Sequence, residues 1–180
     1  MCDIQVEMPQ PGRRLPLPIE PAMTEKLEVV PRNLLDLEYE LRENGMPVGS
    51  IVRTPLQVLE KGTVSTEGRE YAILRESVTR AKYLLRGADG NVRARAERKG
   101  STGAAYRILF DGSDVLIKKK VLARRETYLI TDVSEPFGSI IREKLDSRQM
   151  TVELSDKASG VPREIILFMA WIVLLIHGRE

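Results

Sequence analysis

The feature that most constrains the fold is an unbroken run of apolar residues near the end of the chain, Ile165 to Ile176 in "PREIILFMAWIVLLIHGRE". Pro162 suits a first helical turn, Glu164 suits the positive helix end, and Gly178 is a natural stop, which predicts a helix over about 162–177. The helix has no polar stripe, so something must surround it on all sides.

Two environments satisfy that requirement: the interior of a folded domain, or a membrane that holds the tail as an anchor. At 1.5 Å per residue the apolar run covers roughly 18 Å, whereas the hydrocarbon core of a bilayer is about 30 Å thick. The short length favours a buried core helix, and the tail anchor stays as the alternative.

The residues before the helix show the two-residue period of β-strands. In "LLDLEYEL" the side chains of Leu35, Leu37, Tyr39 and Leu41 alternate with charged residues, which is typical of a strand with one solvated face. The Asn-Gly pair in "RENGMP" predicts a tight turn, after which "VGSIVRT" returns.

The same pattern recurs along the chain. Strands are predicted in "REYAILRES", "RAKYLLR", "VRARAER" (with Val92, Ala94 and Ala96 on one face), "AAYRILF", "VLIKKKV", "ETYLITD", "FGSIIRE" and "RQMTVEL". Ten or more short strands joined by turns predict an antiparallel barrel or sandwich. A seven-residue strand rises about 23 Å and a sixteen-residue helix about 24 Å, so the helix fits inside a closed barrel.

An internal echo links two of these strands. "PVGSIVR" at 47–53 and "PFGSIIR" at 136–142 agree at five of seven positions, and each opens a returning strand. The glycine two places after each proline predicts a bend or a close backbone approach. The echo indicates two hairpins in equivalent places of a pseudo-repeating sheet, with chance as the alternative for so short a match.

Residues 1–31 hold six of the ten prolines and are interpreted as a flexible leader, so that the barrel domain spans 32–180. The leader is either a disordered tail, which the composition favours, or a Pro-rich ligand for a protein partner. The single cysteine, Cys2, and single histidine, His177, argue against a zinc site, and no cofactor is expected. One cysteine and no signal peptide indicate a cytoplasmic protein.

The DG-type turns, the returning segments "VGSIVR" and "FGSIIR" and the terminal helix "IILFMAWIVLLI" resemble the Tubby C-terminal superfamily. Within it, residues 33–180 are most similar to the LURP-one-related proteins and phospholipid scramblases. The resemblance implies a barrel of twelve strands threaded by its C-terminal helix, and phosphoinositide binding through basic residues on barrel strands. Scramblases add cysteine clusters and a calcium-binding segment, and "ELSDKASGVP" lacks the dense oxygen ligands for that ion.

Two basic clusters are the candidate sites for anionic lipid. The candidates are Arg93, Arg95 and Arg98 in "RARAERK" and Lys118, Lys120 and Arg124 in "KKKVLARRE". Brought together, they would hold a phosphorylated headgroup or a membrane surface; the plainer interpretation is solubilising charge on the outer barrel face.

We therefore expect a non-enzymatic binding or adaptor module, placed in the cytoplasm or peripherally at a membrane. A tail-anchored, scramblase-like protein is the alternative. An enzyme ranks third because the only histidine lies at a helix end. Nucleic acid is not expected as a partner, since aromatic residues make up 5% of the chain and net charge is +2.

Overall fold

The computed structural model describes residues 23–32, 37–54, 61–77, 79–100, 105–120, 125–132, 135–142, 148–158 and 160–177. These residues form twelve strands, one short 3₁₀ helix and one α-helix. Their bounds are β1 Met23–Pro31, β2 Glu38–Glu43, β3 Met46–Thr54, β4 Lys61–Thr66, β5 Arg69–Ser77, β6 Lys82–Gly87, β7 Val92–Lys99, β8 Ala105–Phe110, β9 Ser113–Lys119, β10 Thr127–Thr131, β11 Pro136–Arg142, β12 Met150–Ser155, η1 Asp156–Ala158 and α1 Arg163–His177.

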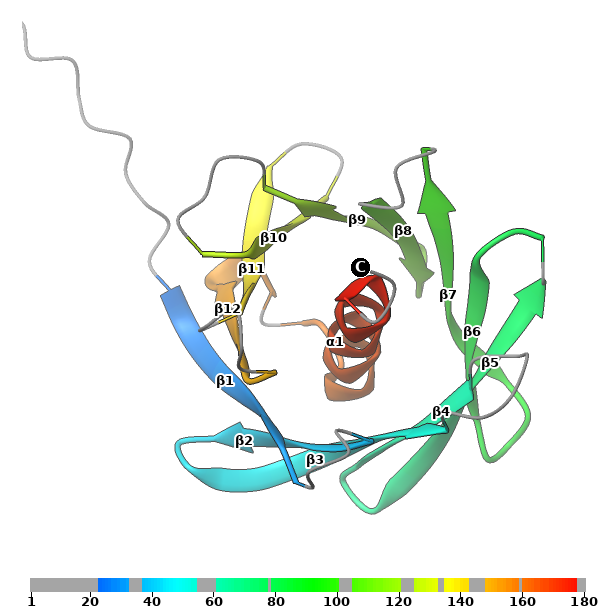
Figure 1. Ribbon diagram of the computed structural model, residues 1–180, viewed down its shortest axis with the longest axis horizontal. Coiled ribbons are helices and arrows are strands. Elements are labelled where there is room, and N and C mark those ends of the chain that lie inside the picture. The colour runs from blue at the N-terminus through cyan, green and yellow to red at the C-terminus, as the bar shows by residue number, and fades with distance from the viewer. Residues whose placement is uncertain are drawn as a thin grey trace, which may run out of the picture.

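The strands form one closed antiparallel barrel in which each strand pairs with its neighbours in the chain. The first and last strands complete the circle, with Leu27 opposite Val152 and Val29 opposite Met150. Figure 1 looks into this barrel and shows α1 in its centre. The predicted fold, a closed antiparallel barrel around a C-terminal apolar helix, is confirmed.

The helix supplies the middle of the hydrophobic core. Every side chain from Ile165 to Ile176 is buried, which satisfies the requirement that an all-round apolar helix be enclosed. Trp171 packs edge-on against Tyr83 of β6, with 5.2 Å between ring centroids, and stacks with Phe168 at 6.4 Å. In the described part of the chain no helix has the length and apolar character needed to cross a membrane.

The two ends of the barrel differ in their connections. What we call the turn end carries the short turns at 44–45, 67–68, 88–91 and 111–112, and the opposite end, where β1, β3, β5, β7, β9 and β11 finish, is called the loop end. In the Asn44-Gly45 turn both residues have positive φ, 51° and 79°, as a type I′ hairpin requires. The helix begins at the turn end, where Arg163 donates to Glu43 at 2.7 Å, and runs toward the loop end.

The echo between 47–53 and 136–142 corresponds to a shared structural device. In β3 the register skips Val48, because Pro47 pairs with Arg42 and Gly49 with Leu41. In β11 the register likewise skips Phe137, the residue between Pro136 and Gly138. Each skipped residue is a β-bulge, which turns an extra side chain toward the core. The two returning strands therefore share a bulge at the same position of the repeated segment.

The structure corrects the boundary of the proposed leader. Residues 23–31, assigned from sequence to the flexible leader, form β1, which pairs with both β2 and β12 and closes the barrel. The barrel domain thus begins by Met23 rather than at residue 32, and the rest of the leader lies outside the described residues.

Two further details differ from the prediction. The strand β4 was not expected, because Val64 is its only large apolar residue. Val92 does not share the inward face of Ala94 and Ala96: a bulge at Arg93 shifts the register of β7 against β6, and Val92 is exposed.

Candidate functional site

The six basic residues singled out from the sequence do not form one patch. Arg93 lies at the turn end and donates to Asp89 at 2.8 Å, and Arg95 donates from the outer face of β7 to Glu76 of β5 at 3.0 Å. Both guanidinium charges are thus compensated by carboxylates. The pKa of Asp89 is lowered, chiefly by the hydrogen bond that it accepts from the backbone of Asn91 and further by Arg93.

Three of the other candidates gather at the loop end. Arg98 is near the end of β7, Lys118 is near the end of β9, and Lys120 directly follows β9. Within the described residues, none of these three side chains forms an ion pair. Arg124 lies outside the described residues.

The strand register gives the spacing of these cations. Arg98 pairs with Tyr106 of β8, which pairs with Ile117 of β9, so Arg98 is two strands and one residue from Lys118. Two strand spacings amount to about 10 Å. Arg98 follows the inward phase of Ala94 and Ala96 and sits at the barrel rim, while Lys118 is on the outer face. The cations without an ion-pair partner among the described residues therefore lie both at the rim and on the outer face just beside it.

The loop end as a whole is basic in the part of the chain that the structure describes. Its acids are fewer than its bases and comprise Glu38, Glu40, Glu76, Glu97 and Glu126. The bases of the loop end are Arg32, Arg53, Lys61, Arg75, Arg80, Lys82, Arg98, Lys99, Lys118, Lys119, Lys120, Arg125, Arg142 and Arg148. The loop end, toward which the helix runs, therefore carries a net positive charge among the described residues.

The turn end has the opposite balance among the described residues. Its bases are Lys26, Arg42, Arg69, Arg86, Arg93, Arg107, Lys157 and Arg163. Its acids are more numerous and comprise Glu25, Glu43, Glu67, Glu70, Asp89, Asp111, Asp114, Asp132, Glu135, Glu153, Asp156 and Glu164. The net charge of +2 hides this polarity, because the two ends largely cancel.

Some loop-end cations have a structural role instead. Lys119 lies 2.6 Å from Glu126, and the second carboxylate oxygen of Glu126 lies 3.3 Å from Arg142. This largely buried carboxylate joins the ends of β9 and β11, so Lys119 and Arg142 help to hold the barrel together. The orientation of Lys119, opposite to Lys118, agrees with the strand alternation predicted from the sequence.

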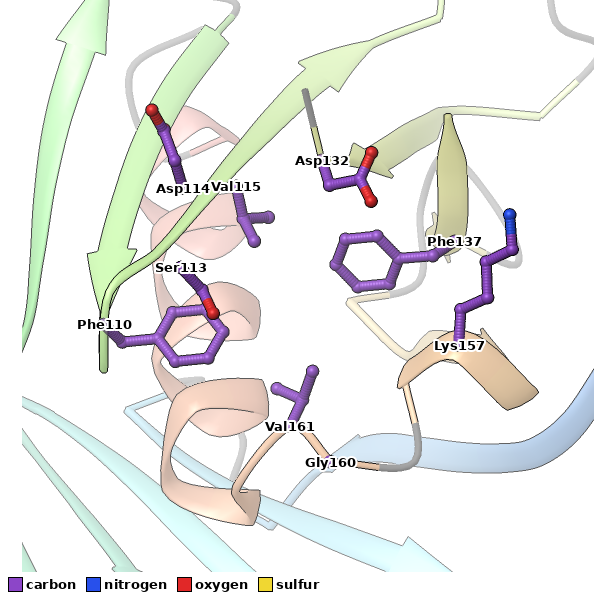
Figure 2. A pocket seen from close by; sticks show the side chains of 9 residues that line it. All are labelled: Phe110, Ser113, Asp114, Val115, Asp132, Phe137, Lys157, Gly160 and Val161. Atoms are coloured by element: carbon purple, nitrogen blue, oxygen red, sulfur yellow. The ribbon is translucent and has the colours of Figure 1, made fainter. Parts of the chain in front are cut away.

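Two surface hollows are formed by residues that the structure describes. A groove of about 640 Å³ runs along the outer face of β10, β11 and β12, where Leu129 and Ile141 supply apolar walls and Lys120 stands at its loop end. A second hollow, of about 420 Å³, opens at the turn end and is shown in Figure 2. Sequence reasoning missed both, because their walls come from separate strands.

The rim of the turn-end hollow includes a bidentate ion pair. Arg107 donates through Nε to both carboxylate oxygens of Asp114, at 2.8 and 3.0 Å, and also through Nη2. These hydrogen bonds hold the pKa of Asp114 below its usual value and raise that of Arg107. Arg107 therefore neutralises one of the acids beside the hollow.

Comparison with protein-family models, with curated proteins and with solved structures gave no match for this chain. Among the residues that the structure describes, no group of three or more His, Cys, Asp or Glu side chains is placed to hold a metal ion.

Proposed function

We propose that this protein is a non-enzymatic binding module whose loop end docks on anionic phospholipid headgroups. The observation that carries the proposal is the presence there of Arg98, Lys118 and Lys120, which have no ion-pair partner among the described residues, within a basic end. Arg93 and Arg95 are left out of the proposed site because Asp89 and Glu76 already compensate their charges.

The energetics favour a surface over a single small anion. The open cations are spread about the rim, roughly 10 Å apart across β7 to β9, and are not focused on one point. Each basic residue near an anionic membrane contributes about 1 kcal/mol, and the attraction falls off within a Debye length. Several rim cations acting together give useful affinity at physiological salt, and the acidic turn end orients the barrel with its loop end toward the membrane.

Membership of the Tubby-like barrels is part of this proposal. A ring of twelve antiparallel strands around a C-terminal helix is what the resemblance to that superfamily implies, and the observed element order supports it. The tail-anchored, scramblase-like alternative is less well supported, because the helix would have to leave the barrel lumen in which its side chains are buried. A cytoplasmic protein, peripheral at the membrane, fits the proposed mode of binding.

The test is co-sedimentation with vesicles of phosphatidylcholine alone or with added phosphoinositide. We expect binding only to the anionic vesicles, and weaker binding as salt increases. The triple variant R98Q/K118Q/K120Q is expected to bind roughly 150-fold more weakly, from about 1 kcal/mol for each of the three charges.

A matched control removes three cations from the turn end, as R69Q/R86Q/R93Q. It changes net charge by the same amount, so an effect of total charge would weaken both variants equally. Equal weakening would mean that the rim cations only solubilise the barrel. Failure of the unmodified protein to bind anionic vesicles at low salt would refute lipid docking altogether.

A further inference from the structure

The groove on the outer face of β10, β11 and β12 is lined mainly by apolar surface. The three strands are neighbours in the barrel, as Figure 1 shows, and Leu129 and Ile141 supply apolar walls. The volume of the groove, about 640 Å³, falls within the range of small-molecule sites. Because the barrel is closed, no strand edge lies beside the groove for an extended peptide to pair with. A small ligand with an apolar body fits these walls better than a peptide does.

The floor of the groove contains a buried hydroxyl group without a partner. Ser139 and Ser155 alternate with the inward-facing Ile140 and Leu154, so they belong to the outer face of the barrel. They are nevertheless only 7% and 6% exposed, which places them at the bottom of the groove that they line. Ser155 Oγ is buried and forms no hydrogen bond with a described residue. A buried hydroxyl left unpaired costs free energy, and a ligand oxygen beside it would remove that cost.

A lysine lies at the loop end of the groove. The Lys120 backbone N–H donates to the carbonyl of Thr127 at 2.7 Å, which fixes the base of the lysine side chain beside β10. The Lys120 ammonium forms no ion pair with a described residue. Glu126, the neighbour of Thr127, is already bound by Lys119 and Arg142. The loop end of the groove is therefore favourable for an anionic group.

The other charged residue among those that line the groove is an acid. Glu153 of β12 lies opposite Ser139 of β11 on one side and Lys26 of β1 on the other. The charges toward the turn end are thus mixed, and the carboxylate of Glu153 repels a second carboxylate placed there. An anionic ligand is therefore oriented, with its charged end at Lys120 and its apolar body directed toward Ser155.

The strand register gives the length of this ligand. Lys120 is level with Thr127, which pairs with Ile141, and Ile141 pairs with Thr151, four residues before Ser155. Three strand spacings and four residues separate the backbones of Lys120 and Ser155 by roughly 20 Å. The lysine side chain spans part of this distance. An extended chain of twelve carbons, with bonds of about 1.5 Å, covers roughly 14 Å of the remainder.

We propose that the groove along β10, β11 and β12 binds a medium-chain hydroxy acid. Its carboxylate would lie at Lys120, its hydrocarbon chain along Leu129 and Ile141, and its hydroxyl at Ser155. A hydroxyl group both donates and accepts, so it satisfies Ser155 Oγ in either orientation of the serine O–H. The acid is taken from solution, whereas lipid docking uses a membrane surface and the rim of the loop end. The two proposals share Lys120, and neither depends on the other.

The test uses 12-hydroxydodecanoate as the probe, below the concentration at which it forms micelles and without vesicles. Saturable shifts are expected for Leu129, Ile141 and Ser155 in ¹⁵N spectra of the full chain. Dodecylammonium, which has the same chain length and the opposite charge, is expected to bind at least tenfold more weakly. Equal or tighter binding of dodecylammonium would overturn the proposal. The absence of saturable shifts with the acid would also overturn it, whether or not the protein sediments with vesicles.

Two lysine variants locate the carboxylate. Lys120→Gln is expected to bind the acid roughly fivefold more weakly, as for a partly exposed ion pair. The matched control Lys61→Gln removes the same charge from the loop end, but on β4, on another side of the barrel. It should bind as the parent does. If both variants weaken binding equally, the carboxylate does not lie at Lys120 and the proposal is wrong.

A serine variant locates the hydroxyl. The parent is expected to prefer 12-hydroxydodecanoate over dodecanoate roughly fivefold, because only the former supplies a partner for Ser155 Oγ. Ser155→Ala removes the unpaired hydroxyl and adds no bulk, so the fold should be retained. In this variant the two acids should bind equally. A preference that persists in Ser155→Ala would refute the proposed position of the hydroxyl group.

Discussion

Gly62 of β4 makes room for the indole of the central helix. A Cβ atom at this position would lie 2.6 Å from Trp171 Nε1 and 2.8 Å from the carbonyl oxygen of Val52. One obstacle is therefore a fixed backbone atom. The other is a ring held between Tyr83 and Phe168. Substitution of Gly62 by alanine requires Trp171 or the β3–β4 pair to move.

The expected cost of Gly62→Ala follows from these contacts. Overpacking a filled core typically costs about 1–3 kcal/mol, and alanine recovers about 0.4–1 kcal/mol by restricting the unfolded chain. We expect a net loss of about 1–2 kcal/mol, equivalent to about 2–8 °C in Tm for a domain of this size. Urea unfolding followed by fluorescence is well suited, because Trp171 is the only tryptophan and reports its own displacement.

Gly160→Ala is the matched control. No atom lies within 4 Å of the Cβ that it would add, and its backbone is outside the positive-φ region. It should be neutral or slightly stabilising. In a Trp171→Phe background, which lacks Nε1, Gly62→Ala should cost less than in the parent. Because this background has no tryptophan, the coupling energy is measured by urea unfolding of all four proteins followed by circular dichroism. If Gly62→Ala leaves the free energy of unfolding and the Trp171 emission unchanged, then Trp171 does not need the space that a glycine at position 62 provides.

Two other outcomes follow from the packing and the ion pairs. Truncation after Val161 removes the buried helix and exposes the lumen, so we expect aggregation and no cooperative unfolding; a monodisperse, folded barrel on size exclusion and near-UV circular dichroism would contradict this. Arg107 lowers the pKa of Asp114, so the pair stabilises the fold above the ordinary carboxyl pKa and that contribution disappears as pH falls through the lowered value. Asp114→Asn should therefore have a lower Tm than the parent at pH 7 and an equal one near pH 2, and a gap that persists in acid would exclude the ion pair as its cause.

The alternation of side chains predicted most strands because one face of each contacts the helix. Tyr39 and Leu41 in β2, and Met150, Val152 and Leu154 in β12, are buried as their two-residue period required. The strand β4 lacked that signal for a physical reason. Its inward positions include Gly62 and Thr66 because the helix side chains occupy the space that larger residues would fill.

The β1 strand was hidden by its surroundings in the sequence. It ends at Pro31 and follows a proline-rich stretch, so composition associated it with the leader. Its place depends on pairing with β12, more than a hundred residues away. The pattern of residues within 23–31 does not reveal that this segment pairs with a strand so far away in the sequence.

The candidate site was predictable only in part. Composition identified Arg98, Lys118 and Lys120 as basic, but the same reasoning gave equal weight to Arg95, whose partner Glu76 lies two strands away. The separation of charge between the two ends of the barrel could not be predicted from the order of residues either. Neighbouring strands run in opposite directions, so the residues that meet at one end come from separate segments of the sequence.

The pairing of the first strand, β1, with the last strand, β12, has a consequence for how the chain folds. Neighbouring hairpins form from local contacts, but the β1–β12 seam and the contact between Glu43 and Arg163 join residues far apart, the latter by 120 positions. Until the seam closes, every partial sheet has two unpaired edges and an uncovered apolar face. Folding is therefore expected to be slow for a chain of this length, and the incomplete ring is the species most exposed to edge-to-edge association with other copies.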